Sequence, residues 1–469
     1  MILLINPPNP DKLVSNKDMM GGLGQIYPAG PGTSSVPPLD LYYCAAILKT
    51  SGIPFVLMDC LPGNVAADKA LAEAVEMKPS LVLVRTSLPT LAADLAFSQE
   101  LKASSGARIS FFGPVTGLVS DDLLSGGADA VLVGEPEAIL PELAANGFLF
   151  PAVPGIGWKE RGCIMRNPEA KPMQDLDALP FPLWEARPAD FKIKPFFEEE
   201  PYLPLLASRG CPFGCGYCPY TRLQGRVWRP RSAANVLAEV KHNSADLGVR
   251  NVLFRDPEFT LNEARTLEIC EGLRVLGGIR WVCETRPDTV TPDMIRAMAA
   301  AGCSQINFGV ESVSAKALEA SGRKAVDRKR LSLLAAEAKR AGVRLFCFFI
   351  MGLPGQKRRD ILNDVDFAFV NLPGLVQFTC ATPYPGTAMR DWAEARQYIE
   401  ERDYAKYSGY APVMRNETLS TADLAELMAF AREKLRARGG PGKTLRSAAG
   451  YLYRRLSLKI RETRLEAKG

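Results

Sequence analysis

Three cysteines within eight residues constrain this chain more than any other feature of its sequence. They are Cys211, Cys215 and Cys218, at C-x3-C-x2-C spacing, and Gly214 and Gly216 allow tight turns between them. A loop this short can direct three thiolates at one small inorganic centre. Four thiolates would close a zinc site or saturate an iron–sulfur cluster, whereas three leave one iron of a 4Fe–4S cluster open to a further ligand. A zinc site whose fourth ligand lies elsewhere in the chain is the alternative.

The first 150 residues alternate between short apolar runs and helical patterns. Strands are predicted over residues 2–6, 55–59, 81–84, 109–112 and 130–133, and helices over 39–50, 66–77, 91–104 and 137–144. This alternation predicts a doubly wound, Rossmann-like parallel sheet, which binds ligands at the carboxyl ends of its strands. The chain lacks the G-x-G-x-x-G fingerprint of nicotinamide cofactors, so the residues alone leave the ligand open. The Gly- and Pro-rich insert over residues 9–38 is predicted to be a structureless loop.

Residues 201–390 show a second alternation of strands and helices. Strands are predicted over 203–208, 251–255, 280–283, 305–308, 344–350 and 376–380, and helices over 233–246, 262–276, 291–301, 315–320, 328–341 and 358–370. Six such strands predict an open, partial (βα)6 barrel with functional groups at the strand carboxyl ends. Polar residues follow several of these strands, namely Asp256, Glu258, Arg286, Glu311 and Ser312. Surface ion pairs are the alternative explanation of these residues.

The cysteine motif, with an aromatic residue before its third cysteine, resembles the radical S-adenosylmethionine (SAM) enzymes; the aromatic residue here is Tyr217. The resemblance implies a 4Fe–4S cluster on Cys211, Cys215 and Cys218, whose open iron chelates the methionyl amine and carboxylate of SAM. Reductive cleavage of SAM would then give a 5′-deoxyadenosyl radical. It also implies cofactor contacts from Tyr217, Asp256, Glu258, Arg286, Glu311 and Ser312. Asp256 and Glu258 stand where other members have Gly-Gly-Glu, and the two glycines are missing here.

The first domain resembles the cobalamin-binding domains that precede some radical SAM barrels. The similar segments are Asn6-Pro7-Pro8, Pro37-Pro38-Leu39, Gly113-Pro114 and Gly134-Glu135-Pro136-Glu137. The resemblance implies cobalamin contacts at Ser87, Thr90, Gly113, Gly134 and Glu135. The chain has one histidine, His242, which is predicted on a helix surface outside this domain, so cobalamin is expected to bind without a histidine ligand. A vestigial domain, or one that binds another ligand, is the alternative.

These resemblances predict a cobalamin-dependent radical SAM methyltransferase that acts on an unactivated carbon. A cobalamin-linked oxidative cyclase or ring rearrangement enzyme is one alternative, and a non-catalytic cobalamin- or redox-sensing module is another. Methylthiolation is disfavoured because the other cysteines form no second three-cysteine motif. The expected partners are a small-molecule or lipid-like substrate and an electron donor such as flavodoxin or ferredoxin, with no nucleic acid.

Composition adds limits on location and on the end of the chain. Eleven cysteines without a disulfide-like spacing predict a reducing compartment, the cytoplasm, and no apolar run is long enough to span a membrane. Residues 431–469 carry twelve basic and three acidic residues, and an apolar stripe from Leu445 to Ile460 has helical spacing. Such a helix lies on an anionic membrane surface or covers the protein's own core. The predicted regions are the cobalamin-binding domain over 1–150, a linker over 151–200, the barrel over 201–390 and a helical region over 391–469.

Overall fold

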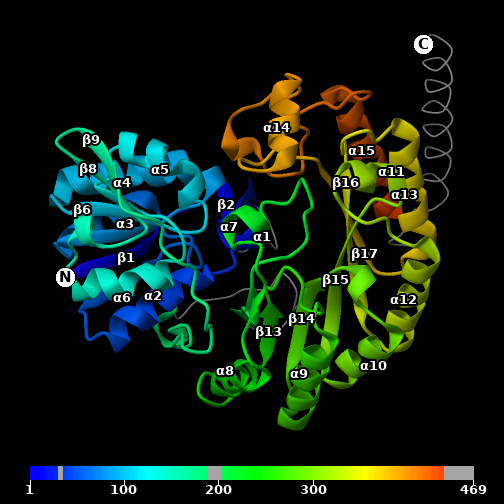
Figure 1. Cartoon of the computed structure of the whole chain (residues 1–469), viewed down its shortest axis with the longest axis horizontal. Helices are drawn as coiled ribbons and strands as arrows, with labels where there is room; N and C mark the ends of the chain where they lie inside the picture. Colours follow the sequence, from blue (N-terminus) through cyan, green and yellow to red (C-terminus); the bar gives the residue numbers. More distant parts are fainter. Residues whose placement is uncertain (30–34, 189–201, 438–469) are drawn as a thin grey trace. The chain divides into compact units, whose positions relative to one another are not determined.

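The computed structural model describes residues 1–29, 35–188 and 202–437 (Figure 1). The chain divides into two compact units, each built from three separate segments of the sequence. The first unit comprises Met1–Pro212, Pro219–Pro257 and Val275–Trp281, and the second comprises Phe213–Cys218, Glu258–Arg274 and Val282–Gly469. The residues of the predicted barrel are therefore divided between the units.

A seven-stranded sheet forms the core of the first unit, with the order β4-β1-β5-β6-β7-β8-β9. Its strands are β1 (Ile2–Asn6), β4 (Phe55–Asp59), β5 (Leu81–Arg85), β6 (Arg108–Phe112), β7 (Ala130–Leu132), β8 (Ile156–Glu160) and β9 (Cys163–Arg166). The strands from β4 to β7 pair in parallel, whereas β8 and β9 form an antiparallel hairpin on the β7 edge. Strands β1 and β5 are buried along their whole length and are apolar except for their last residues, Asn6 and Arg85, as expected for a parallel sheet covered on both faces.

Helices cover this sheet in the predicted doubly wound manner. Helix α2 (Leu39–Thr50) packs beside α6 (Pro136–Ala145), and α3 (Ala67–Glu76) packs beside α4 (Leu91–Ser105) on the opposite face (Figure 1). Helix α5 (Thr116–Ser125), which follows the Gly113-Pro114 turn, was not predicted from the sequence. This helix is irregular, since Val119 inside it has φ −131° and ψ 17°.

The prediction of a structureless insert between β1 and α2 is wrong. Strand β2 (Leu13–Asn16) pairs with β3 (Gln25–Pro28) in an antiparallel hairpin, and the short helix α1 (Met19–Gly22) lies between them. The turn uses left-handed backbone at several positions, including φ 75° at Gly21 and φ 95° at Gly24. An added Cβ at Gly24 would lie 2.7 Å from Ser87 Cβ, so the glycine allows the hairpin to pack directly on the end of β5. Such a tertiary contact has no periodic sequence signal.

The hairpin places Lys17 where the strand order of the sheet reverses, around β1 and β5. Its Nζ atom is buried, 2.8 Å from Asp94 Oδ1, and donates to the backbone oxygen of Arg85 at 3.0 Å. Burial lowers the pKa of Lys17, although the Asp94 carboxylate opposes this shift. The insert therefore joins strand β5 and helix α4 through one buried ion pair.

The second sheet has six strands in the order β10-β13-β14-β15-β16-β17. They are β10 (Tyr202–Leu205), β13 (Asn251–Phe254), β14 (Arg280–Thr285), β15 (Cys303–Glu311), β16 (Arg344–Met351) and β17 (Leu375–Cys380). The helices between them are α8 (Ala233–Ala245), α9 (Glu263–Leu276), α10 (Pro292–Ala300), α11 (Ala315–Ala320), α12 (Arg328–Arg340) and α13 (Arg358–Asn371). In the second unit β15, β16 and β17 pair in parallel, which agrees with the predicted strand–helix alternation of a partial barrel.

Shorter elements complete the described chain. A two-stranded ladder joins β11 (Ser208–Arg209) to β12 (Arg229–Pro230), with α7 (Tyr220–Leu223) between them in sequence. Helices α14 (Ala388–Ala395) and α15 (Thr421–Ala437) follow β17, and α15 packs on β17 and α13. The predicted amphipathic stripe from Leu445 to Ile460 lies outside the described residues.

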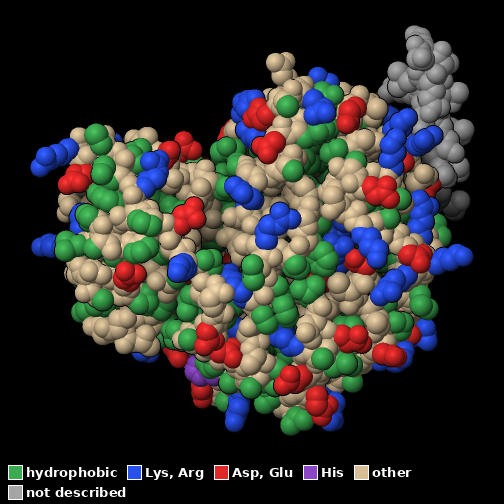
Figure 2. Space-filling model, viewed as in Figure 1, with side chains coloured by type: hydrophobic (Ala, Val, Ile, Leu, Met, Phe, Trp, Pro, Cys, Tyr) green, Lys and Arg blue, Asp and Glu red, His purple; other side chains and the backbone are tan. Residues whose placement is uncertain are grey.

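Two surface properties bear on partners. No helix in the described ranges is both long and apolar enough to cross a membrane. On the face of the molecule shown in Figure 2, basic and acidic side chains are interspersed.

The buried ion pair of the insert gives a stability prediction. Lys17→Met leaves Asp94 buried without its cation, and we expect the free energy of unfolding to fall by about 3–5 kcal/mol. Equilibrium urea denaturation measures this change. The control is Lys69→Met, since Lys69 makes a 3.8 Å pair with Glu73 on an exposed helix surface, and it should change stability by less than about 1 kcal/mol. Equal effects of the two substitutions would contradict the role given to Lys17.

Candidate functional site

The cysteine loop leaves the short strand β11 through a glycine that no other residue can replace without movement. Gly210 has φ 82°, and an added Cβ would lie 2.1 Å from the backbone oxygen of Val227. The following residue, Cys211, donates its backbone N–H to the oxygen of Gly225 at 3.1 Å. The start of the loop is thus fixed by backbone packing.

The three predicted cluster ligands are partly exposed, and none of the eleven cysteines, all of which are described, forms a disulfide. Their thiols are not gathered into a ready metal site. Within the described parts of the chain, no group of three or more histidine, cysteine or acidic side chains has that arrangement. The assignment of Cys211, Cys215 and Cys218 as metal ligands therefore stays a prediction from their spacing.

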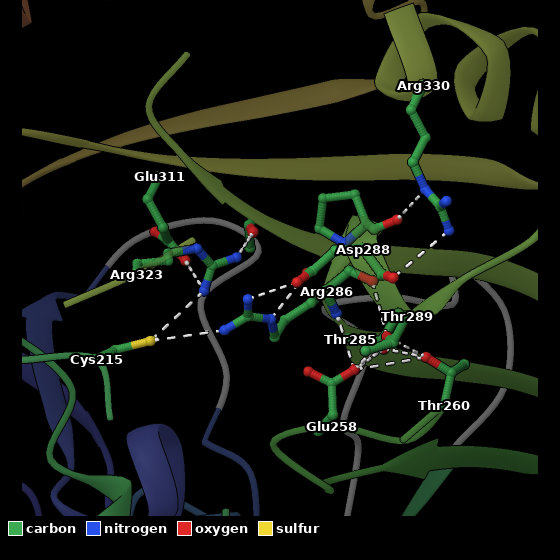
Figure 3. A network of polar contacts seen from close by, with 12 residues as sticks. Cys215, Glu258, Thr260, Thr285, Arg286, Asp288, Thr289, Glu311, Arg323 and Arg330 are labelled. Atoms are coloured by element: carbon green, nitrogen blue, oxygen red, sulfur yellow. Dashed lines mark hydrogen bonds and ion pairs between the residues drawn. The ribbon is translucent and has the colours of Figure 1, made fainter. Parts of the chain in front are cut away.

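Two buried guanidinium groups lie beside the thiol of Cys215 (Figure 3). Arg286 Nη1 is 3.7 Å from Cys215 Sγ, and Arg323 Nη1 is 3.9 Å from the same sulfur. Arg286 was predicted from its place after a strand, whereas Arg323 was not predicted. Arg323 follows α11 in a short Ser-Gly-Arg turn, and only the tertiary fold brings it to the cysteine loop.

The Arg286 side chain is held by two neighbours, Asp288 and Phe213. Its Nε and Nη2 atoms donate to the two carboxylate oxygens of Asp288 at 2.8 and 2.6 Å, and its guanidinium carbon lies 3.9 Å from the centre of the Phe213 ring. Burial opposes the ionisation of Asp288, but the hydrogen bonds from Arg286 keep the pKa of Asp288 below its usual value. Arg286 therefore presents Nη1 in a fixed direction, towards Cys215.

Glu258 is a buried carboxylate with one satisfied and one unsatisfied oxygen. Its Oε1 atom accepts hydrogen bonds from the hydroxyl groups of Thr285 and Thr289 and from the backbone N–H of Arg286 at 3.2 Å (Figure 3). Its Oε2 atom is buried and has no hydrogen-bond partner. Burial raises the pKa of Glu258, and the hydrogen bonds to Oε1 act against that shift. The two threonines were not predicted from the sequence. They hold the carboxylate so that Oε2 can accept a hydrogen bond from a ligand.

Glu311 ends β15 in a strained conformation. Its φ is 65°, which is uncommon for a residue other than glycine, and a β-bulge lies between Gly309 and Glu311. Its Oε1 atom is 3.8 Å from Arg323 Nη1, and the hydroxyl of Tyr217 hydrogen-bonds to the carboxylate. Burial raises the pKa of both Glu311 and Tyr217. The Glu311 carboxylate thus lies near Tyr217 of the cysteine loop, and its implied contact with a cofactor stays a prediction.

Two other predicted residues of the barrel are engaged by the fold itself. Asp256 accepts from the backbone N–H of Ala207 at 2.9 Å and from the hydroxyl of Ser208. Ser312 donates to Asp364 Oδ2 at 2.8 Å. These contacts connect strand ends to neighbouring elements, and they leave the cofactor roles of Asp256 and Ser312 as predictions.

The alternative explanation as surface ion pairs is wrong for the barrel residues. Asp256, Glu258, Arg286 and Glu311 are only 0%, 1%, 6% and 9% exposed. Ionisable groups rarely become so deeply buried without a partner or a ligand.

The predicted cobalamin contacts of the first unit differ in what surrounds them. Ser87 and Thr90 are buried and hydrogen-bonded to each other at 2.8 Å. A Cβ at Gly113 would lie 2.8 Å from Arg85 Nη1, so this glycine serves close packing. Glu135 accepts from Arg229 Nη1 at 3.0 Å. Gly134 differs from the other four. Its φ is 114°, and no atom lies within 4 Å of a Cβ placed on it.

A cavity of about 50 Å³ lies beside Gly134 in the first unit. Its lining includes Pro114 and Glu137, and the buried Oε2 atom of Glu137 has no hydrogen-bond partner, although Oε1 accepts from Arg209 at 2.7 Å. This volume holds a few water molecules or one small polar group of a ligand. A corrin ring would have to lie outside this cavity and could place only a side group in it.

Residues 205–368 match the family model of the Radical SAM superfamily. This part of the chain is therefore a radical SAM domain. The resemblance found at the cysteine motif is thereby confirmed. The matched residues begin at the end of β10 and continue into α13, so they include every barrel residue discussed above.

Curated relatives of this chain include a protein named as a methyltransferase and one named as a cyclase. The chain is 30% identical over 304 residues to an uncharacterized methyltransferase of Pyrococcus horikoshii, an alignment that covers 64% of this chain and 65% of the relative. It is 23% identical over 407 residues to the anaerobic magnesium-protoporphyrin IX monomethyl ester cyclase of Cereibacter sphaeroides, covering 83% of this chain and 65% of the cyclase. The chain thus spans slightly less than two thirds of the length of each relative.

The fold of this chain also matches a solved structure. That structure is TsrM, a radical S-adenosylmethionine methyltransferase from Kitasatospora setae, with cobalamin and a 4Fe–4S cluster bound. The match has a TM-score of 0.71 at 18% identity and covers 94% of this chain and 89% of TsrM. The predicted fold class, a Rossmann-like domain followed by a radical SAM barrel, is confirmed.

Proposed function

We propose that this chain is a cobalamin-dependent radical SAM methyltransferase that methylates an unactivated carbon. One observation carries the proposal. The unsatisfied carboxylate oxygen of Glu258 and the guanidinium of Arg286 belong to one buried network that also reaches Cys215. A carboxylate and a guanidinium together complement the ammonium and carboxylate of an amino acid head group. SAM carries such a head group, and here the receptor lies beside a predicted iron ligand.

The donor set of the cysteine loop suits a 4Fe–4S cluster. Cys211, Cys215 and Cys218 would hold three irons, and the cations of Arg286 and Arg323 would stabilise the thiolate of Cys215. When bound, the cluster and SAM supply hydrogen-atom abstraction and cobalamin supplies a methyl carrier.

The chain's own residues would bind and orient the substrate of that chemistry. Glu258 Oε2 would accept from the ammonium group, and Arg286 would donate to the carboxylate. Glu311 and Tyr217 offer hydrogen-bonding groups for ribose hydroxyls. Since Glu258, Arg286 and Glu311 are buried, their charges interact more strongly than they would in water.

Cobalamin is supported by the fold shared with TsrM and by the open space at Gly134. We propose that it binds without a histidine ligand. His242, the one histidine of the chain, lies on α8, where Nδ1 is 2.6 Å from Asp246 and Nε2 is 3.6 Å from Glu185. Both ring nitrogens are thus engaged with acidic neighbours on the same part of the surface.

An oxidative cyclase is the second candidate, because one relative is named as a cyclase and its alignment covers most of this chain. Methyl transfer is favoured by the names of the Pyrococcus horikoshii relative and of TsrM. Under either reaction we propose a small-molecule or lipid-like substrate, and a flavodoxin or ferredoxin as electron donor.

The basic end of the chain gives a prediction about membranes. Residues 431–469 carry twelve basic residues, each of which contributes about 1 kcal/mol of attraction when it lies near an anionic membrane surface. We expect the full chain to bind anionic vesicles in a co-sedimentation assay, and this binding should weaken with added salt. Deleting residues 440–469 should abolish the binding while the barrel stays folded. A full-length protein that never binds vesicles, or a deletion that unfolds the barrel, would instead assign the tail a structural role.

Product mass tests the reaction itself. The protein is purified anaerobically, supplied with iron, sulfide and hydroxocobalamin, and incubated with reductant, SAM and candidate substrates. Methyl transfer adds one CH2 unit to the substrate mass, and cyclisation or rearrangement does not. We expect the CH2 increment together with release of 5′-deoxyadenosine.

The matched control for this assay is a cysteine substitution. Cys215→Ala should abolish 5′-deoxyadenosine release, whereas Cys163→Ala, at an exposed position on β9, should not. A Cys215→Ala protein that retains full SAM cleavage would contradict the cluster assignment. A product without the CH2 increment would favour the cyclase or rearrangement reaction.

A further inference from the structure

We propose that Arg323 is the positioning residue that fixes Cys215 and raises the reduction potential of the iron–sulfur cluster at that thiol. The inference rests on the proposed function, because that function places the cluster at Cys215. It concerns a residue that the sequence motifs did not indicate.

Arg323 connects three parts of the second unit. Its Nη1 atom is 3.9 Å from Cys215 Sγ, donates to the Tyr217 hydroxyl at 3.3 Å and lies 3.8 Å from Glu311 Oε1. Its Nη2 atom donates to the backbone oxygen of Gly309 (Figure 3). One buried guanidinium thus contacts the cysteine loop and both sides of the bulge that ends β15.

The turn that carries Arg323 also holds the backbone of the cysteine loop. The N–H of Gly216 donates to the backbone oxygen of Ser321 at 2.8 Å. Gly322 has φ 69°, and an added Cβ would lie 2.9 Å from the backbone oxygen of Gly214. The loop and the turn therefore fit closely, and the position of Arg323 relative to Cys215 is set by backbone contacts as well as by its side chain.

The charge of Arg323 is less compensated than that of Arg286. Arg286 donates two hydrogen bonds, of 2.8 and 2.6 Å, to the Asp288 carboxylate, which neutralises the charge of Arg286. Arg323 instead pairs with the Glu311 carboxylate at the longer distance of 3.8 Å, and burial raises the pKa of Glu311. The Nε atom of Arg323 is buried without a hydrogen-bond partner. Arg323 is thus the stronger source of positive potential at the Cys215 sulfur.

A positive charge at a ligating sulfur favours the more negative, reduced state of a cluster. Hydrogen bonds to the sulfurs, local charge and solvent exposure set the potentials of iron–sulfur centres. A guanidinium that is itself buried exerts this effect with little screening by water or salt. Removing the charge should therefore make the cluster harder to reduce.

The test is an EPR-monitored redox titration of the anaerobically reconstituted full chain. We expect Arg323→Gln to lower the equilibrium constant for reduction about tenfold, which is about 59 mV for a one-electron couple. Arg323→Lys, which keeps the charge, should shift the potential less. The matched control is Arg330→Gln, because Arg330 is exposed and donates to backbone oxygens such as that of Val290 at 2.7 Å; its potential should equal that of the wild type.

Each outcome of this titration bears on one claim. Full iron content with an unchanged potential in Arg323→Gln overturns the inference. If Arg323→Gln is folded by circular dichroism but loses its iron, Arg323 is required to position Cys215. The potential of Arg323→Lys then tests the effect of the charge. A potential equal to that of the wild type supports the charge effect, and a shift as large as the one expected for glutamine overturns it. A wild-type protein that binds no cluster contradicts the proposed function instead.

Discussion

The thiol of Cys215 lies beside two buried guanidinium groups, and much of the second unit serves to keep those cations in place. Removing an arginine from water is costly unless its donors find acceptors. Asp288 and the Phe213 ring satisfy Arg286, and the Gly309 oxygen, Tyr217 and Glu311 surround Arg323. The strand ends, the bulge and the turn after α11 supply these acceptors. The site is therefore a product of the sheet that carries it.

Buried charged side chains are also paired in the first unit. Lys17 pairs with Asp94 behind the strand ends, and Glu137 pairs with Arg209, which stands two residues before the cysteine loop. Each pair satisfies groups that would be costly to bury alone. The atoms left over are informative for this reason. Unsatisfied acceptors remain at Glu137 Oε2 and Glu258 Oε2, where a ligand that donates hydrogen bonds would complete the network.

The sequence predicted the elements whose pattern is local. Strand β1 and helix α2 were predicted with their observed bounds, because a continuous apolar run and a helical period are properties of neighbouring residues. Glu258, Arg286 and Glu311 could be selected because parallel strands collect their carboxyl ends at one edge. Arg323 and the threonines around Glu258 could not, since their importance comes from contacts between segments distant in sequence.

Two kinds of residue limited the predictions. Ser87 and Gly113 stand at the expected strand ends, but the insert hairpin and the Arg85 side chain occupy the space around them, and glycine or serine at a turn does not reveal what packs on it. The insert itself folds through left-handed turns without apolar periodicity. Composition therefore suggested a structureless loop where the fold contains a hairpin that packs on the end of β5.

The central claim is that a carboxylate and a guanidinium next to Cys215 receive the amino acid head group of SAM. The EPR spectrum of the reduced cluster, recorded with and without SAM, tests it directly. We predict that SAM changes the spectrum of the wild-type protein and that Glu258→Gln needs a much higher SAM concentration for the same change, with its cluster otherwise intact. A spectrum that SAM leaves unaltered in the wild type, or an identical response in Glu258→Gln, would contradict this account.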